Sequence, residues 1–217
     1  MGSTTWPRII SRENAPIWIG VGERAAATAL LVAAAPIGIA AALVVWILSG
    51  RSPLIAHRRV GWRGAPLWML KLRTMWPGAA APDARFHWIE RLDDDRGPEL
   101  KHPEDTRVTS RFARFLRRHS IDELPQLWHV LCGQMSLVGP RPMTRRELDR
   151  YYGDAAREIL ESKPGLAGLW QVSGRNRLSY AERRALDLQL VRGRSARLYL
   201  RILLRTVPEV WSGADSW

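Results

Sequence analysis

Residues 25–50 read AAATALLVAAAPIGIAAALVVWILSG, a run of 26 residues without a charge between Arg24 and Arg51. As one helix, rising about 1.5 Å per residue, this run is long enough to cross a hydrocarbon core of about 30 Å. Pro36 lies near its middle, where it removes a backbone hydrogen bond and bends a helix. We therefore expect a Pro-kinked helix whose two short arms re-enter one leaflet of a membrane.

Arginines flank this segment on both sides, whereas a spanning helix carries its surplus of basic residues on the cytoplasmic side only. That symmetry favours a re-entrant helix, with a spanning helix and a cleaved signal peptide as the alternatives. We divide the chain into an N-terminal membrane segment, 1–52, and a remainder, 53–217. The flanking residues are Arg8, Arg12 and Arg24 before the segment and Arg51, Arg58, Arg59 and Arg63 after it.

The composition is that of a basic chain of about one domain. The 217 residues are 46% hydrophobic and carry a formal net charge of +12, and of the 33 basic residues only Lys71, Lys101 and Lys163 are lysine. Arginine grips phosphate and carboxylate with two hydrogen bonds, so we expect anionic partners: phosphates, nucleic acid or acidic lipid. The single cysteine, Cys132, excludes an internal disulfide framework.

The remaining sequence indicates a small, irregular α/β fold. Apolar runs around a Gly-rich centre predict a β-hairpin within 54–75. Residues 77–104 are rich in Pro, Ala, Asp and Arg, and we expect a mobile or weakly helical excursion there, whereas 136–142 is expected to be an ordered loop. The expected helices are 111–118, 121–131, 144–162, 179–193 and 196–207, and a short apolar strand is expected within 163–174.

Three of these helices carry further expectations. Ser120 with Glu123 is expected to form a capping box at the start of helix 121–131, and Ser179 is expected to cap helix 179–193 with Glu182 at its third position. Helix 196–207 is expected to end before Pro208, and its apolar stripe is flanked by arginines. Such a helix suits a membrane interface, with its apolar face in lipid and its arginines among phosphates; an ordinary surface helix is the alternative.

Asp122 and Glu123 are adjacent carboxylates in the first turn of helix 121–131. Adjacent helical positions diverge by about 100 degrees, so the two side chains cannot share one task but can take two. One can be a nucleophile or base, and the other can bind a divalent cation such as Mg²⁺, which prefers carboxylate and phosphate oxygens. The alternative is that both simply complement the helix dipole, as acidic residues in first turns often do.

Several cations are expected to be held in place around this pair. The stiff motifs GPRP (139–142) and GRN (174–176) fix Arg141 and Arg175, while Lys71 and Arg73, two apart on a strand, share one face. Cations held in advance around a carboxylate and a metal describe a site for a diphosphate, where charge neutralisation and alignment dominate phosphoryl transfer. The sequence contains no Walker loop, GxGxxG or HExxH motif.

Three segments closely resemble the bacterial sugar transferase family, the monotopic polyprenyl-phosphate phosphoglycosyl transferases. They are KLRTM (71–75), RFLRRHSIDELPQLWHVLCGQMSLVGPRP (114–142) and KPGLAGLWQVSGRN (163–176). The resemblance implies that Asp122 attacks the sugar-bearing phosphate of a UDP-sugar, expels UMP and holds the phosphosugar until polyprenyl phosphate takes it. It also implies that Glu123 binds Mg²⁺ and that Lys71, Arg141 and Arg175 contact substrate; Arg73 joins them because it shares the strand face of Lys71.

The resemblance also implies the partners and the location. We expect a UDP-sugar, undecaprenyl phosphate and the bacterial inner membrane as partners, with the catalytic domain 53–217 on the cytoplasmic face and a homodimer as a further assembly. The activity would begin exopolysaccharide or glycan synthesis. We expect no nucleic-acid partner, because helix 121–131 is acidic at its start and interrupted by Pro125. An inactive scaffold is the remaining alternative, against which the intact pair argues.

The sequence departs from the family pattern at four positions. Gln134 stands where the family usually has Asp, and we expect it to remove a charge near the site. Ser110 is an extra residue, Thr106 stands where Pro is common, and Ala35 precedes Pro36 where relatives have Ser. Neither Ser110 nor Thr106 touches Asp122 or Glu123.

Overall fold

The computed structural model describes residues 17–76, 87–93, 108, 110–174 and 177–212. The apolar segment forms one helix, α1 (Ile17–Ser49), which continues through Pro36. Within the described ranges it is the single helix that is long and apolar enough to cross a membrane. The kink and the re-entrant path stay predictions, because a helix that continues through a proline can have either a straight or a bent axis.

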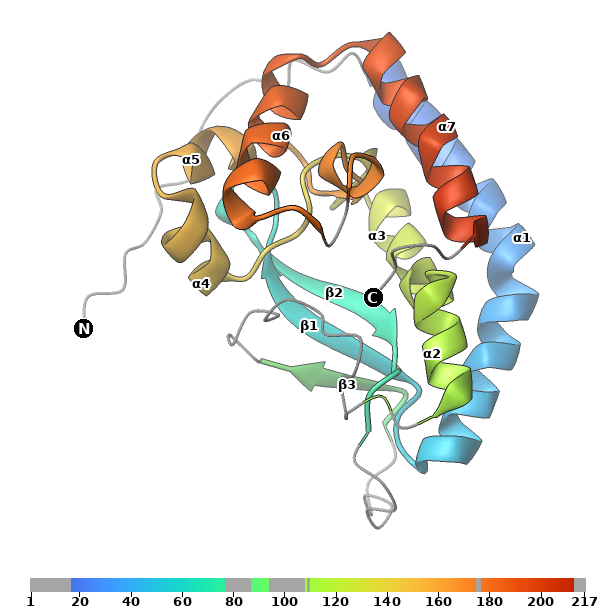
Figure 1. Ribbon diagram of the computed structural model, residues 1–217. Coiled ribbons are helices and arrows are strands. Elements are labelled where there is room, and N and C mark those ends of the chain that lie inside the picture. Colours follow the sequence, from blue (N-terminus) through green and yellow to red (C-terminus); the bar gives the residue numbers. More distant parts are fainter. Residues whose placement is uncertain (1–16, 77–86, 94–107, 109, 175–176, 213–217) are drawn as a thin grey trace.

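Helix α1 packs along the domain through a stripe of mostly small residues. Ala27, Ala41 and Val45 on this stripe are buried, and Leu31 and Gly38 between them are half-buried. The opposite face carries large apolar side chains that are exposed, among them Val32, Ile39 and Ile47. Figure 1 shows α1 running beside α2 (Arg111–Arg118), α3 (Leu127–Leu131) and α7 (Ala196–Ser212).

The start of α1 is tied down by one carboxylate. Glu23 Oε1 accepts a hydrogen bond from the Leu137 backbone N–H at 3.1 Å and from the Tyr199 hydroxyl at 2.6 Å, and it also accepts one from Ser136 Oγ. Burial and the Glu23 carboxylate raise the pKa of Tyr199, so this hydroxyl stays a donor. Glu23 therefore joins three elements that are distant in the sequence.

The predicted hairpin forms. Strands β1 (Leu54–Val60) and β2 (Pro66–Leu72) are antiparallel, with Leu54 opposite Leu72, and the short 3-10 turn η1 (Trp62–Gly64) connects them. Strand β3 (Ile89–Leu92) pairs in parallel with the other edge of β1, giving the order β2-β1-β3. This strand corrects the expectation of a mobile or weakly helical excursion over 77–104 at its residues 89–92. Residues 77–86 and 94–104 of that range lie outside the described residues.

A second small sheet pairs β4 (Ser136–Val138) with β5 (Gly165–Ala167) in parallel, so the predicted loop 136–142 begins with a strand. Strand β5 confirms the apolar strand expected within 163–174. The two segments lie against each other where the Gly139 N–H donates to Ala167 O at 2.9 Å and the Gly165 N–H donates to Pro140 O at 2.8 Å. A Cβ on Gly139 or Gly165 would overlap the other backbone, so both positions require glycine.

Helix α2 (Arg111–Arg118) lies where the sequence predicts it. Its N-cap is Ser110, whose hydroxyl accepts from the backbone N–H groups of Phe112 and Ala113 at 3.1 and 3.4 Å. The extra residue relative to the family pattern therefore stabilises the start of this helix, since a capped first turn satisfies donors that otherwise have no helical partner.

The helix expected over 121–131 is two elements, the 3-10 helix η2 (Ile121–Gln126) and the α-helix α3 (Leu127–Leu131). Pro125 lacks an N–H and cannot continue an α-helical ladder, which accounts for the tighter first part. The expected capping box is wrong. Ser120 has φ 54 and makes no side-chain cap bond, because the chain turns sharply here from α2 into η2.

The single helix predicted over 144–162 is also wrong. It is divided into α4 (Arg145–Glu147), the π-helical turn η3 (Leu148–Tyr152) and α5 (Ala155–Leu160). Gly153, with φ 50, separates the last two, a conformation that glycine adopts without steric cost.

The last two helices follow the short 3-10 turn η4 (Trp170–Val172). Helix α6 (Tyr180–Arg192) begins with the expected capping box of Ser179 and Glu182. Helix α7 (Ala196–Ser212) runs through Pro208, past its predicted end. Pro208 removes the hydrogen bond that its N–H would donate to the carbonyl of Leu204, and the helix continues for about one more turn.

Helix α1 contributes to two parts of the core. Ala27 packs with Met69, Leu127 and Val130, and further along the helix Ala41 and Val45 pack in a cluster with Leu72 and Leu116. The segment that carries Asp122 and Glu123 is thus supported by α1 and by the hairpin together. Helices α4, α5 and α6 lie together at one end of the larger sheet (Figure 1).

Candidate active site

The short helix η2 places the two adjacent carboxylates in different surroundings. Asp122 is 8% exposed, whereas Glu123 is half-buried. Helix η2 contacts α1, α2, α3 and β2. The pair is therefore held in a tightly supported turn, with one carboxylate largely removed from water.

Lys71 of β2 reaches Glu123 of η2. The distance from Lys71 Nζ to Glu123 Oε1 is 2.6 Å, and the two side chains are 14% and 27% exposed. The structure thus brings together two residues that the sequence assigned to one site, 52 positions apart. Because both charges are shielded from water, their attraction exceeds that of an exposed pair.

His129 holds the strand next to Lys71. Its Nε2 accepts a hydrogen bond from the Leu70 backbone N–H at 3.1 Å, and its Nδ1 lies 2.7 Å from Gln134 Oε1. An Nε2 that accepts has no proton, so in the neutral ring Nδ1 carries the proton and donates to Gln134. Gln134 therefore keeps the acceptor that an Asp would offer while removing its charge.

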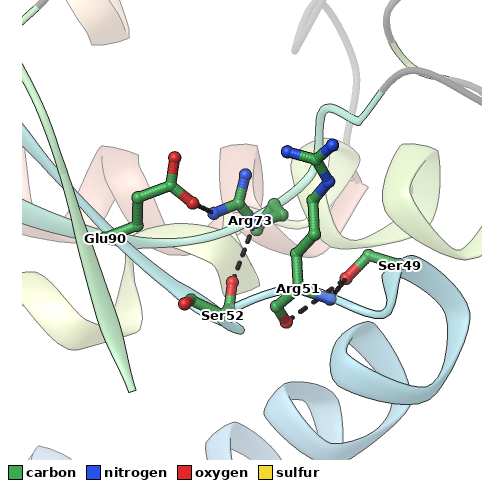
Figure 2. Close-up of polar contacts among 5 residues, drawn as sticks. All are labelled: Ser49, Arg51, Ser52, Arg73 and Glu90. Atoms are coloured by element: carbon green, nitrogen blue, oxygen red, sulfur yellow. Dashed lines mark hydrogen bonds and ion pairs between the residues drawn. The ribbon is translucent and has the colours of Figure 1, made fainter. Parts of the chain in front are cut away.

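Arg73 lies in a separate polar cluster, shown in Figure 2. Its Nε donates to Ser52 O at 2.8 Å, and its terminal nitrogen pairs with Glu90 of β3. The side chain is 6% exposed, so it links the α1–β1 connection to the sheet. The sequence placed Arg73 beside Lys71; its contacts instead join it to Ser52 and Glu90, and its role in substrate binding stays a prediction.

Arg141 stacks on a tryptophan. Its guanidinium carbon lies 5.8 Å from the centre of the Trp170 ring, and that of Arg183 lies 4.6 Å from the same ring. The Gly139–Gly165 crossing fixes the loop that carries Arg141. Burial and the neighbouring charge of Arg141 lower the pKa of Arg183. Two cations thus share one indole at the base of the GPRP loop.

Asp187 of α6 is fully buried. Its Oδ2 accepts from the Tyr152 hydroxyl at 2.9 Å, and its Oδ1 has no hydrogen-bond partner among the described residues. Burial raises the pKa of Asp187 to about 7, although the Tyr152 hydroxyl and the charges of Arg141 and Arg183 act in the opposite direction. Burial also raises the pKa of Tyr152, which therefore stays protonated.

Sequence reasoning missed His129, Trp170, Arg183 and Asp187. The spacing of Arg183 and Asp187, four residues apart on a helix that the sequence does predict, was a usable signal, because such residues lie on one face. The contacts of His129 and Trp170 depend on other elements and leave no local pattern. Arg175 lies outside the described residues.

Glu123 is the residue predicted to bind Mg²⁺. Its carboxylate is partly exposed, and one of its oxygens already contacts a cation, the ammonium of Lys71. Hard carboxylate oxygens are what Mg²⁺ prefers, and this ion usually keeps further positions for substrate phosphates and water. The carboxylate of Glu123 thus has the chemistry that a cation needs, and its role as a Mg²⁺ ligand stays a prediction.

Comparison with known proteins shows the family of this chain. The sequence profile described as "Bacterial sugar transferase" matches residues 19–213. The exopolysaccharide production protein ExoY of Rhizobium meliloti is 40% identical over 196 residues, which cover 88% of this chain and 84% of that protein. The UDP-glucose:undecaprenyl-phosphate glucose-1-phosphate transferase of Caulobacter vibrioides is 41% identical over 193 residues, covering 85% of this chain and 66% of that protein.

Other relatives are longer. The UDP-galactose-lipid carrier transferase of Erwinia amylovora is 40% identical over 179 residues, which cover 76% of this chain and 35% of that protein. This chain thus spans about a third of that relative and most of ExoY. The matched range includes α1 as well as the segment with Asp122 and Glu123. Because the match covers nearly its whole length, the chain belongs to the bacterial sugar transferase family.

Proposed function

We propose that this protein transfers a sugar 1-phosphate from a UDP-sugar to undecaprenyl phosphate, releases UMP and so begins the synthesis of an exopolysaccharide or glycan. Relatives whose names state a sugar-phosphate transfer to undecaprenyl phosphate support the reaction class. The observation that carries the proposal is the pair on η2, a buried Asp122 beside a Glu123 that already contacts a cation.

In the first step, a carboxylate oxygen of Asp122 attacks the phosphorus that bears the sugar. The P–O bond of the diphosphate to UMP breaks, and UMP leaves with the bonding electron pair. The product is an aspartyl-phosphosugar on Asp122. Burial of Asp122 supports this assignment, because excluding water protects an acyl phosphate from hydrolysis.

In the second step, a phosphate oxygen of undecaprenyl phosphate attacks the same phosphorus. The bond to Asp122 breaks and restores the carboxylate, and the lipid leaves as a diphosphate-linked sugar. The same nucleophile thus serves both halves of the reaction, which splits one difficult transfer into two easier ones.

Cations around the diphosphate neutralise its charge. We assign Glu123 to hold Mg²⁺, which when bound neutralises phosphate oxygens and aligns them for transfer. Lys71, Arg141 and Arg175 are the assigned phosphate or nucleotide contacts. For Arg73 we favour a positioning role within this proposal, because its head group is engaged by Ser52 and Glu90.

The packing of α1 supports a monotopic attachment to the inner membrane. The contact stripe from Glu23 to Val45 is about 33 Å long at 1.5 Å per residue, as long as the hydrocarbon core is thick. A spanning α1 would therefore draw the segments packed on it, including η2 and α3, into lipid. We instead place the exposed apolar face of α1 in one leaflet, with the catalytic domain on the cytoplasmic face.

The exposed residues of neighbouring elements agree with this placement. Trp128 of α3 and Leu200, Leu204 and Val207 of α7 are half-exposed or more. Large apolar side chains exposed on several elements are typical of a protein that lies on a membrane.

A donor panel tests the proposal. The full chain in lipid nanodiscs would be incubated with Mg²⁺, undecaprenyl phosphate and each UDP-sugar in turn, and UMP release would be followed. We expect one donor to give UMP, and Asp122→Asn to abolish both UMP release and the covalent phosphosugar adduct seen by mass spectrometry. Asp149→Asn, at a half-exposed carboxylate on η3 paired with Arg145, is the matched control and should retain turnover.

Two results would contradict the proposal. Near wild-type turnover of folded Asp122→Asn would remove the nucleophile assignment. Silence of the folded wild type across the whole panel would favour an inactive scaffold.

A further inference from the structure

Lys71 is held so that its ammonium faces Glu123. Within the hairpin it lies opposite Ile55, and the preceding N–H, that of Leu70, is bound by His129 on the other side. The backbone of Lys71 is therefore fixed from two directions. Glu123 is equally constrained by the packing of η2 against β2.

The ammonium lies at an oxygen that a metal would use. Lys71 Nζ is 2.6 Å from Glu123 Oε1, whereas Mg²⁺ binds carboxylate oxygen at about 2.0–2.1 Å. A carboxylate oxygen has two lone pairs, but a metal that approaches along the one used by Lys71 overlaps the ammonium and is repelled by it. Such a metal has to displace Lys71.

A displaced Lys71 needs another anion. Its side chain is 14% exposed, so moving the ammonium away from Glu123 without a replacement partner would leave a largely buried charge unpaired. The diphosphate of a donor provides such a partner. It also provides further oxygen ligands for the metal.

We propose that Lys71 and Mg²⁺ compete for Glu123, so that the metal enters together with the donor diphosphate, which takes over the ammonium of Lys71. This inference rests on the proposed function for the identity of the donor. In the enzyme without donor, Lys71 keeps Glu123 in place and holds the metal site closed. The pair thus couples metal binding to the presence of substrate.

Mn²⁺ binding without any nucleotide tests the competition. The full chain in nanodiscs would be titrated with Mn²⁺, and the free ion would be measured by electron paramagnetic resonance. Lys71→Met removes the ammonium and keeps the chain length, and we expect it to bind Mn²⁺ at least tenfold more tightly than wild type. Lys71→Gln is the second variant, in case the first fails to fold.

Three controls make the result specific. Lys71→Arg keeps the cation and should bind Mn²⁺ as weakly as wild type. Lys163→Met removes one positive charge at a lysine that lies against Trp62, and it should leave the Mn²⁺ affinity unchanged. In a Glu123→Gln background, Lys71→Met should give no gain.

Equal or weaker Mn²⁺ affinity of folded Lys71→Met and Lys71→Gln would overturn the inference, as would a gain that persists without Glu123. The UMP assay is separate from this measurement. If Lys71→Met gains Mn²⁺ affinity but the wild type releases no UMP, the competition is supported and the proposed reaction is rejected. If the wild type releases UMP but the variant gains no affinity, the reaction is supported and the competition is rejected.

Discussion

His129 binds the backbone N–H of Leu70 through Nε2 and Gln134 through Nδ1, and so connects α3 to the strand that carries Lys71. Gln134→Leu removes the acceptor of the Nδ1 proton while leaving the ring in place. We expect it to lower the free energy of unfolding by about 1 kcal/mol, the typical net contribution of one hydrogen bond. Gln134→Asp keeps an acceptor, and denaturant unfolding should place it closer to wild type than Gln134→Leu; the opposite order would contradict the assigned tautomer.

The crossing of Gly139 and Gly165 admits no side chain. Gly139→Ala and Gly165→Ala should each destabilise the protein strongly, because the new Cβ would overlap the backbone of the other strand. Gly38→Ala is the matched control: it lies in α1 with nothing within 4 Å of the added carbon, so it should be neutral or stabilising by up to about 1 kcal/mol. Thermal unfolding compares the three, and equal melting temperatures would contradict the close approach.

Asp187 makes stability depend on pH. Its pKa is raised from 3.8 to about 7, so between these values the folded protein keeps a proton that the unfolded chain has lost. Stability from this group is therefore lost as pH rises toward 7, by up to about 1.4 kcal/mol per pH unit. Asp187→Asn cannot titrate, so its stability should fall less steeply between pH 5.5 and 7. Denaturant unfolding across this window checks the slope, and parallel curves would contradict the prediction.

The contact stripe of α1 can be tested with a pair of neighbours. Ala41→Leu introduces three carbons at a position that is 5% exposed, and overpacking should cost about 1–3 kcal/mol. Ala40→Leu introduces the same carbons at an exposed position of the same helix and should cost little. Comparing the unfolding of the two variants in nanodiscs locates the packed face; equal destabilisation would argue against it.

Elements with strong local signals could be predicted from the sequence. The Gly-rich centre between two apolar runs predicted the hairpin β1–β2, and Ser179 with Glu182 predicted the start of α6. Lys71 and Glu123 were assigned to one site, and they are in contact.

The features that were missed depend on distant partners. Strand β3 has four residues and exists because it pairs with β1. Arg73 is paired with Glu90 of β3, and Asp187 is hydrogen-bonded to Tyr152, 35 positions earlier in the chain. The left-handed Ser120 follows from the sharp turn between α2 and η2 rather than from its own propensity. Such conformations are set by packing, which periodicity does not record.

The contact stripe of α1 has a consequence for the height of the reaction relative to the membrane. Because α1 also supports the core around η2, the vertical distance between the lipid-facing side of this helix and Asp122 is fixed by packing. If that side lies in lipid, the height of the nucleophile above the acyl chains is fixed as well. A polyprenyl carrier could then remain dissolved in the leaflet while its phosphate meets the enzyme, and exchange of one carrier for the next would be lateral diffusion in two dimensions.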